Sequence, residues 1–462
     1  MSEHRSSVLN MTEGDTISLI VRFSIPMLIG NLFQQLYNLV DSVIVGQFVG
    51  SAALGSIGAT NSVTFLFFAL CNGFGNGGGI ITSQFFGKGD DDSVKKCIAN
   101  TAYIMMIFPI IVGIVSFLMT APILRLLDTP SELMADAVSY MQIMCLGMIF
   151  VSLYNYASAM LRALGDSKTP LYFLIFSCIL NTGLDVLFVY VFKMSVRGAG
   201  IATVISQFIS AFACLGFAIM KNPYFKMKKE DLKFDLAISG KVVRLGGPLS
   251  LQFSLIAISC MALQKVVNAY GPVAVAAFTA TSRIEQIIHQ PYQTLSAALA
   301  TYTGQNYGAK KMERVREGFR KSFMLMVVFT LIMLPVMQLF GEHIIRIFVN
   351  EEDVIAMGAR AIRITSLFYI MLGIIYVVRG VLNGLGDSLF ALLNGFVEVV
   401  GRFIVPVWMT GMATIGLWGI WWSVGIVWAL SGLTAWLRYF DYRRRKVIKG
   451  GIAYEKSSGH LV

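Results

Sequence analysis

Four polar residues recur at helical spacing inside the first apolar segment of the chain. They are Gln34, Tyr37, Asn38 and Asp41. Residues three, four and seven positions apart lie on one face of an α-helix, so these side chains form a polar stripe. A charged side chain at the centre of a membrane-spanning helix costs roughly 2.5–3.5 kcal/mol. We therefore expect the stripe to face protein or a water-filled cavity, because lipid cannot solvate it.

A second acid lies in a similar setting. The stretch CILNTGLDVLFVY places Asn181 and Asp185 on one helical face, and GIATVIS adds Thr203. If these segments meet the first one, the four side chains Asp41, Asn181, Asp185 and Thr203 offer oxygen ligands for a hard cation such as Na⁺. Alternatively, two neighbouring carboxylates oppose each other's ionisation, so that one holds a proton near neutral pH. A third alternative is that the acids only hydrogen-bond between helices.

The second half of the chain carries other polar candidates. One predicted helix has a stripe made of Ser282, Glu285, Gln286, His289 and Gln293. Glu285 either adds an acid to the cavity or pairs with a basic group such as Lys265. Glu398 has Arg402 one helical turn later and is expected to pair with it. His289 is expected to hydrogen-bond between helices, because no set of further metal ligands accompanies it.

The composition is that of a membrane protein. Of 462 residues, 56% are hydrophobic and 14% are charged, whereas soluble domains carry about 25% charged residues. The net charge of +11 could indicate a nucleic-acid partner, but Lys and Arg occur in short clusters between apolar segments, which is typical of membrane topology. The six cysteines are scattered singly and indicate neither a disulfide framework nor a metal cluster. We expect the partners to be the lipid bilayer and small molecules, with no nucleic acid.

About twelve apolar segments are long enough to cross a membrane as helices, which takes about 20 residues each. They are too long, and lack the alternation, for strands of a β-barrel. We therefore predict an all-α integral membrane protein. The predicted spans are 17–46, 52–81, 97–120, 136–161, 170–192, 198–220, 242–268, 273–301, 322–341, 358–380, 389–411 and 415–437.

The connections between these spans differ in charge. Connections after even-numbered spans hold most of the Lys and Arg, as does the C-terminal sequence RYFDYRRRKVIKG. The alternate connections hold only Arg125, Lys193, Arg197 and Arg346. Because positive charge stays on the cytoplasmic side, we predict a multi-pass protein of the cell membrane with both termini in the cytoplasm.

The chain also contains an internal repeat at an offset of about 221 residues. SQFFGKGD at 83 corresponds to GQNYGAKK at 304, and LGDS occurs at both 164 and 385. Each repeat holds six spans, so the two lobes should be related by an axis along the membrane normal, as in transporters with parallel repeats. We predict an N-terminal lobe at 1–220, a cytoplasmic linker at 221–241, a C-terminal lobe at 242–440 and a basic cytoplasmic tail at 441–462.

Two short sequences look like enzyme sites but have simpler explanations. NGFGNGGG at 72–79 lacks the Lys-Ser/Thr of a phosphate-binding loop, and its small residues suit close helix contact. GLGD at 384–387 matches intramembrane aspartyl proteases, but the first half has ALGD at the same place, where Gly ends one helix and Asp starts the next. We expect no enzyme activity.

The chain resembles the multidrug and toxic compound extrusion (MATE) family, particularly its DinF-like branch. The resemblance covers nearly the whole chain and is carried by IPMLIGNLFQQLYNLVDSVIVG, SQFFGKGD, RALGDSKTP and NTGLDVLF. It implies that Asp41 takes part in proton or sodium coupling and that Pro26 lies at a bend of the first helix. By the same analogy, the chamber around Asp41 includes Gln34, Tyr140, Asn181, Asp185 and Thr203. Where the family pattern has Asn before the Arg of the fourth helix, this chain has Ser158.

These observations together predict a secondary transporter. It would export cationic or amphiphilic organic compounds in exchange for H⁺ or Na⁺ by alternating access, without another cofactor and as a monomer. The predicted substrate chamber combines residues of both halves, namely Gln34, Tyr37, Asn38, Tyr140, Ser158, Glu285, Gln286 and Gln293. The alternative is a flippase of lipid-linked or other amphiphilic substrates from the same superfamily, for which a cationic cavity is expected.

Overall fold

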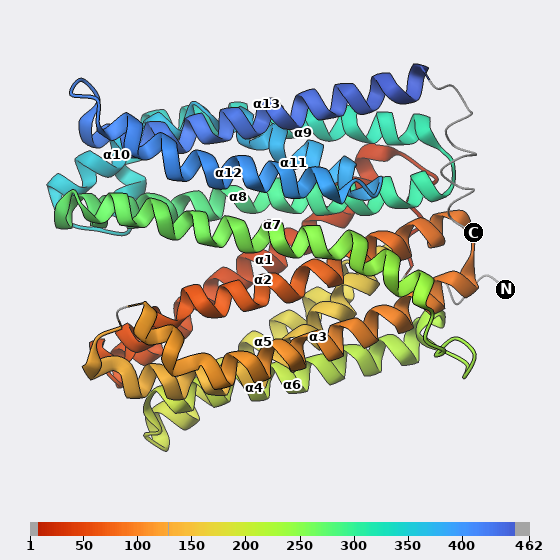
Figure 1. Cartoon of the computed structure of the whole chain (residues 1–462), viewed down its shortest axis with the longest axis horizontal. Helices are drawn as coiled ribbons and strands as arrows, with labels where there is room; N and C mark the ends of the chain where they lie inside the picture. The colour runs from red at the N-terminus through yellow and green to blue at the C-terminus, as the bar shows by residue number, and fades with distance from the viewer. Residues whose placement is uncertain (1–7, 128, 449–462) are drawn as a thin grey trace.

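The computed structural model describes residues 8–127 and 129–448, which are almost entirely helical (Figure 1). The first half contains α1 (Thr16–Phe48), α2 (Ser51–Lys88), α3 (Asp91–Leu126), α4 (Ser131–Ala163), α5 (Lys168–Asp185) and α6 (Ser195–Lys221). The second half contains α7 (Leu236–Asn268), α8 (Gly271–Gly308), α9 (Met312–Arg346), α10 (Glu352–Ser366), α11 (Tyr369–Gly384), α12 (Ser388–Thr410) and α13 (Gly419–Ile448). No strand occurs within the described ranges.

Each predicted span falls on a helix, which confirms the all-α membrane fold, although several helices extend five to eleven residues beyond the predicted bounds. Ten of them are long and apolar enough to cross a membrane. The predicted span 358–380 is divided between two helices, α10 and α11, with a bend of 51° between them. α8 matches the remaining predicted span and is the helix that carries the second polar stripe.

The repeated sequence LGDS ends one helix and starts the next in both halves. Gly165 and Gly386 each have a φ of +87°, a left-handed conformation that glycine adopts without strain. The carboxylate of Asp166 then accepts the backbone N–H three residues later at 2.9 Å, and that of Asp387 does the same at 3.3 Å. GLGD is therefore a helix-capping turn, as the sequence predicted.

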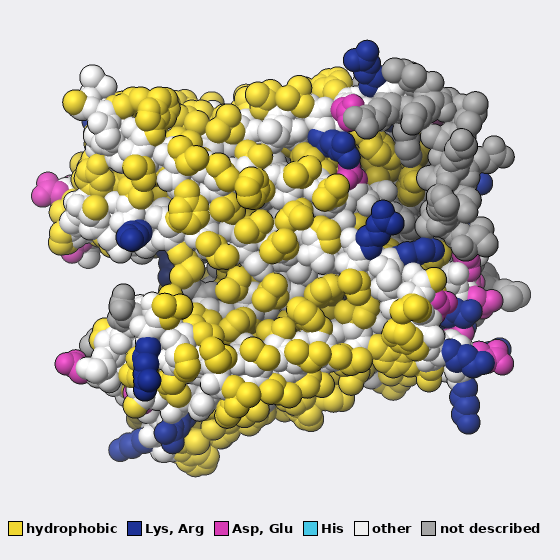
Figure 2. Space-filling model, in the orientation of Figure 1, with side chains coloured by type: hydrophobic (Ala, Val, Ile, Leu, Met, Phe, Trp, Pro, Cys, Tyr) yellow, Lys and Arg dark blue, Asp and Glu magenta, His cyan; other side chains and the backbone are white. Residues whose placement is uncertain are grey.

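The helices form two lobes that lie side by side (Figure 1). The N-lobe comprises α1–α6 and the C-lobe comprises α7–α13. The start of α1, the end of α13 and the connection between α6 and α7 all lie at one end of the molecule, which we call the linker end. Hydrophobic side chains cover the middle of both lobes, and charged side chains gather at the two ends (Figure 2). This distribution suits a protein surrounded by lipid.

The lobes separate at one end and meet at the other. Figure 2 shows a notch between them at the end remote from the linker. At the linker end, Gln84 of α2 donates its Nε2 to the Gly384 carbonyl at 2.8 Å, and Gln305 of α8 donates to the Ala163 carbonyl at 3.0 Å. Donors and acceptors occupy equivalent positions of the repeat, so one contact is made twice. We call this pair of hydrogen bonds the interlobe glutamine contact.

Glycines allow helices of the two lobes to come close together. A Cβ on Gly77 of α2 would lie 2.6 Å from the backbone nitrogen of Gly246 in α7, closer than real Cβ atoms approach. At the linker end, a Cβ on Gly87 would overlap the carbonyl oxygen of Gln305. The glycine-rich stretch 72–79 is therefore a helix-packing surface, as predicted.

Candidate cation site and interlobe cavity

The two acids predicted to act together meet inside the N-lobe. Asp41 of α1 and Asp185 of α5 bring their carboxyl groups within hydrogen-bonding reach of each other. Asp185 is fully buried, with 0% of its surface exposed. One oxygen of each carboxyl group, Oδ1, is buried and has no hydrogen-bond partner among the described residues. Two such oxygens fit a bound cation or a shared proton, because a buried polar atom without a partner is costly.

Polar neighbours from three helices hold this acid pair. Asn181, one turn before Asp185, donates to Asp185 Oδ2 at 2.8 Å and accepts the Thr203 N–H at 3.1 Å when its amide is oriented to satisfy both groups. The hydroxyl groups of Thr203 in α6 and Tyr37 in α1 lie 3.4 Å apart. The four residues predicted as an oxygen set are thus brought together by α1, α5 and α6.

The backbone changes its winding next to the acid pair. α5 ends at Asp185 and continues as a π-helix over Val186–Val191. Such π-turns are uncommon and are frequent at functional sites. Tyr140 of α4 is nearly buried, and its ring lies within electrostatic range of both carboxyl groups. Tyr140 therefore closes the cluster from a fourth helix.

Other predicted residues of the N-lobe make different contacts. Gln34 and Asn38 hydrogen-bond to each other at 3.5 Å along α1. Pro26 lies inside α1, which continues through it as one helix, so a bend there stays a prediction. Ser158 is buried in α4 but lies about 27 Å along the helix from Tyr140, at 1.5 Å per residue. Ser158 and Tyr140 therefore occupy different levels of the lobe.

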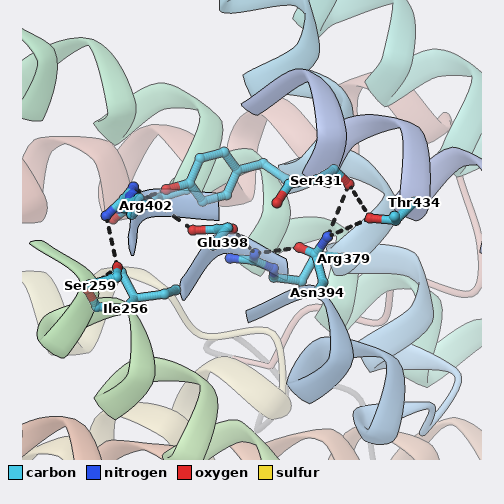
Figure 3. A network of polar contacts seen from close by, with 10 residues as sticks. Ile256, Ser259, Arg379, Asn394, Glu398, Arg402, Ser431 and Thr434 are labelled. Atoms are coloured by element: carbon cyan, nitrogen blue, oxygen red, sulfur yellow. Dashed lines mark hydrogen bonds and ion pairs between the residues drawn. The ribbon is translucent and has the colours of Figure 1, made fainter. Parts of the chain in front are cut away.

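The C-lobe contains a buried ionic network instead of an acid pair (Figure 3). Glu398 of α12 accepts from Arg379 of α11 at 2.9 Å, and its second oxygen lies 3.9 Å from Arg402. Arg379 also donates to Asn394 at 2.8 Å, which in turn donates to the Ser431 carbonyl of α13 at 2.9 Å. The predicted pairing of Glu398 with Arg402 is confirmed, although Arg379 is the closer partner.

Sequence reasoning missed Arg379. Its signal was a single Arg inside the apolar stretch MLGIIYVVRGVLNG, which by the same argument as for Asp41 must find a partner within the protein. The partner could not be named, because α11 and α12 meet only in the folded lobe.

The residues of the second polar stripe differ in their burial and in their contacts. Oε1 of Glu285 is buried without a hydrogen-bond partner among the described residues, and no ion pair joins Glu285 to Lys265 in that part of the chain. Gln293 donates to the Tyr376 hydroxyl at 3.2 Å, and Gln286 is exposed. The prediction that His289 hydrogen-bonds between helices is wrong for Nε2, which is buried without a partner; the ring packs edge-on against Tyr376 and Trp428.

Comparisons with known proteins agree with this architecture. Residues 26–187 and 248–408 each match the MatE family, so the two matches reproduce the internal repeat. The chain is 30% identical to the probable multidrug resistance protein YpnP of Bacillus subtilis, over 95% of this chain and 98% of that protein. It is 24% identical to the multidrug export protein MepA of Staphylococcus saprophyticus, over 93% of this chain and 94% of that one.

A solved structure shows the same fold. It is described as the outward-facing conformation of a multidrug resistance MATE family transporter of the MOP superfamily, and it superposes with a TM-score of 0.89 at 22% identity. The superposition covers 97% of this chain and 100% of that one. The DinF-like branch stays a prediction. Because the family matches both halves and relatives align over almost the whole length, this chain belongs to the MatE family of membrane transporters.

Proposed function

We propose that this chain is an antiporter that exports cationic and amphiphilic organic compounds in exchange for a cation, by alternating access. The observation that carries the proposal is the pair of carboxyl groups, Asp41 and Asp185, placed within hydrogen-bonding reach inside the N-lobe. A buried pair of acids binds positive charge reversibly, and it binds either the coupling ion or the amine of a substrate. The names of the relatives support export of drugs as the direction of transport.

The two ends of the molecule support the proposal of alternating access. In this conformation the cavity opens at the end remote from the linker, and the interlobe glutamine contact closes the linker end. Binding of the coupling ion at the acid pair neutralises it, which weakens its attraction for an organic cation and releases the substrate. The return to the other state requires both hydrogen bonds of the glutamine contact to break. The ion drives this cycle only if it binds the two states with different affinity.

We propose H⁺ as the coupling ion. Two carboxyl groups this close are stable together when one of them is protonated. The proton is then shared between them, and the repulsion between two negative charges is avoided. Na⁺ is the alternative, and Asp41, Asn181, Asp185 and Thr203 would be its ligands, because carboxylate, amide and hydroxyl oxygens suit a hard cation. A Na⁺ ion would supply the same neutralisation of the acid pair. The tests below separate the two ions.

We propose that both termini face the cytoplasm and that one chain acts as a monomer in the cell membrane. The basic sequences near the connection between α6 and α7 lie at the linker end, as the positive-inside rule requires of a cytoplasmic end. One chain holds both lobes and a whole cavity. Glu230 of the connection is exposed. In a variant without native cysteines, Glu230→Cys should react with an impermeant thiol reagent only in inside-out vesicles; labelling in intact cells would reverse the orientation.

A flippase of lipid-linked substrates is the second candidate, and the arginines of the C-lobe are the observation that favours it. Arg379 and Arg402 could meet an anionic headgroup. However, Glu398 offsets one of these charges and the N-lobe opposes them with two acids. A fluorescent pyrophosphate-linked lipid should therefore not be translocated by vesicles that export a cationic dye. Translocation of the lipid, without dye export, would favour the flippase.

The proposed function is tested with inside-out membrane vesicles from a bacterial host that lacks its own drug exporters. A cationic dye should accumulate in vesicles containing this chain when a proton gradient is imposed in sodium-free buffer. A sodium gradient at constant pH should give no accumulation. Accumulation under sodium alone would make Na⁺ the coupling ion, and no accumulation under either gradient would contradict antiport.

A further inference from the structure

The residues just before α1 form a segment that crosses the boundary between the lobes at the linker end. We call residues 9–15 the N-terminal strap. The strap leads into α1 of the N-lobe, yet its backbone lies against helices of the C-lobe. Met11 is fully buried, with 0% of its surface exposed, and Thr12 is buried beside it. The strap is therefore part of the packed structure, unlike a terminal segment that makes no contacts.

The C-lobe holds the strap through side chains that bind its backbone. Gln305 of α8 accepts the Met11 N–H at 2.8 Å, and Asn306 donates its side-chain amide to the Met11 carbonyl at 3.1 Å. Two basic side chains donate to further carbonyls of the strap, each at 3.0 Å: Lys311 to Thr12 and Arg314 to Gly14. These hydrogen bonds do not depend on the side chains of the strap, and together they attach it to the C-lobe.

The strap touches the N-lobe at the LGDS turn. A Cβ on Gly165 would overlap the Leu9 carbonyl oxygen, so only glycine leaves room for the strap to lie over this turn. The equivalent turn of the C-lobe is more open. Among the described residues, apart from its neighbours in the chain, the atom nearest to a Cβ on Gly386 would be the side-chain nitrogen of Gln84, at 3.6 Å. The strap thus covers one of the two repeated turns.

The strap is connected to the interlobe glutamine contact through Gln305. The side-chain nitrogen of Gln305 donates to the Ala163 carbonyl of the N-lobe, and its side-chain oxygen accepts from Met11. Ala163 lies two residues before Gly165, so one short stretch of the N-lobe meets both Gln305 and the strap. If the lobes separate at the linker end, this stretch moves away from both. Contacts between the strap and this stretch therefore exist only while the linker end is closed.

We propose that the N-terminal strap is a latch that stabilises the conformation closed at the linker end. In the open conformation the strap stays on the C-lobe, which binds its backbone, and leaves the turn at Gly165. An element shifts a two-state equilibrium by the difference in its contacts between the two states, and the strap makes its contact with this turn in one state only. The inference rests on the proposed alternating access and adds an element that sets the balance between its two conformations.

The experiment compares the two repeated turns. Gly165→Ala and Gly386→Ala place alanine at the same positive φ and carry the same backbone cost, but only Gly165→Ala forces the strap away. The probe is Ser83→Cys in α2, at a buried position directly against Gly304 of the other lobe. Its reaction with a maleimide is measured on full-length protein without native cysteines, in detergent. The probe should react about two- to tenfold faster in Gly165→Ala than in Gly386→Ala, the change expected from a contact worth about one hydrogen bond.

A second pair of variants tests the strap from its own side. Met11→Lys puts a positive charge into a buried position beside Arg314, which donates to the Met11 carbonyl, and should release the strap. Met11→Leu keeps the apolar fit, so the Ser83→Cys probe should react faster in Met11→Lys than in Met11→Leu. This pair decides if Gly165→Ala does not fold. Ser210→Cys, at a buried position of α6, is the control for general loosening and should react equally slowly in all four variants.

Equal reactivity of the Ser83→Cys probe within either pair of folded variants would overturn the latch. Faster reaction at Ser210→Cys as well would also overturn it, because the variants would then unfold instead of opening. Failure of the export proposal is recognised separately, since cysteine reactivity requires neither substrate nor gradient. If the strap variants change reactivity in a protein that exports no dye, the latch stands and the export proposal fails. If dye export is normal and the strap variants react like their controls, the latch fails alone.

Discussion

The two lobes share a fold but differ in charge at equivalent positions. α5 of the N-lobe carries Asn181 and Asp185 on its inner face, whereas α12 of the C-lobe carries Arg402 and Pro406 at the corresponding positions. In the N-lobe, Asp41 and Asp185 keep one carboxylate oxygen each without a partner among the described residues. In the C-lobe, Glu398 is bound by arginine, whereas one oxygen of Glu285 is likewise buried without a partner there. A duplicated scaffold has thus kept its packing and its helix caps while its polar interior diverged. A group with unmet polar atoms can bind and release an ion, and a group already paired within the protein serves to hold helices together.

The largest difference between the lobes should appear when their acids are neutralised. Asp41→Asn and Asp185→Asn should each abolish proton-driven dye export, because the remaining acid no longer has a partner with which to exchange a proton. Glu285→Gln in the C-lobe should retain measurable export. The measurement is dye accumulation in inside-out vesicles at matched protein levels, with Asp92→Asn at an exposed helix start as the control. Wild-type export by Asp41→Asn would remove the acid pair from the mechanism.

For the free energy of unfolding, we expect the substitution in the C-lobe to have the larger effect. Glu398→Gln leaves Arg379 and Arg402 buried without a carboxylate, and breaking a buried ion pair costs about 3–5 kcal/mol. Asp185→Asn removes an acid that forms no ion pair with a described residue and should change stability little. Thermal unfolding in detergent, followed by tryptophan fluorescence, compares the two variants. A larger loss for Asp185→Asn than for Glu398→Gln would contradict the assignment of binding to one lobe and of helix anchoring to the other.

At the linker end, we expect a smaller difference, between the two glutamines of the interlobe glutamine contact. Gln84 and Gln305 each donate one hydrogen bond across the lobes, but the side chain of Gln305 also accepts the Met11 N–H at 2.8 Å. Loss of a hydrogen bond costs about 0.5–1.5 kcal/mol, which shifts the ratio of the two states about two- to tenfold. Gln305→Ala should therefore open the linker end more than Gln84→Ala. Reactivity of a cysteine introduced at Thr303, buried in α8 at this end, measures the opening; unchanged reactivity in both variants would show that the contact does not close it.

The smallest effect is expected at the prolines of the first helix of each lobe. Pro26 in α1 and Pro248 in α7 occupy equivalent places in the repeat. Pro26→Ala restores a backbone donor in the helix that carries Asp41 and should slow export a few-fold through the conformational step, with substrate affinity unchanged. Pro248→Ala should have less effect, because α7 carries no part of the acid pair. Equal rates for wild type and Pro26→Ala would show that α1 need not bend there.

Much of the fold could be predicted because its signals are local. Membrane spans are set by runs of apolar residues, and the turns at LGDS are set by a glycine and a capping aspartate that act within a few residues. The bend between α10 and α11 could not be predicted in the same way. No proline or glycine marks it, and the stabilising hydrogen bond from Gln338 to the Arg363 carbonyl comes from another helix.

The residues of the candidate site could be predicted where helical spacing and the need to avoid lipid indicate the same side chains. Asn181 and Asp185 share a helical face, and their meeting with Asp41 follows from the need of each acid to avoid lipid. The partner of Glu398 was harder, since spacing within α12 pointed to Arg402 while Arg379 approaches from α11. Ser158 shows that sharing a helix is not enough to place two residues in one site, because Ser158 and Tyr140 are both on α4 but lie at different depths.

The most direct test of the central claim is to count the protons released when a substrate binds. If the acid pair holds one proton and an organic cation replaces it, adding a cationic dye to the purified protein in weakly buffered, sodium-free detergent solution should release about one proton per dye bound. Asp41→Asn should bind dye and release essentially none. Dye binding to the wild-type protein without proton release, or the same release from Asp41→Asn, would contradict the claim that substrate and proton compete for Asp41 and Asp185.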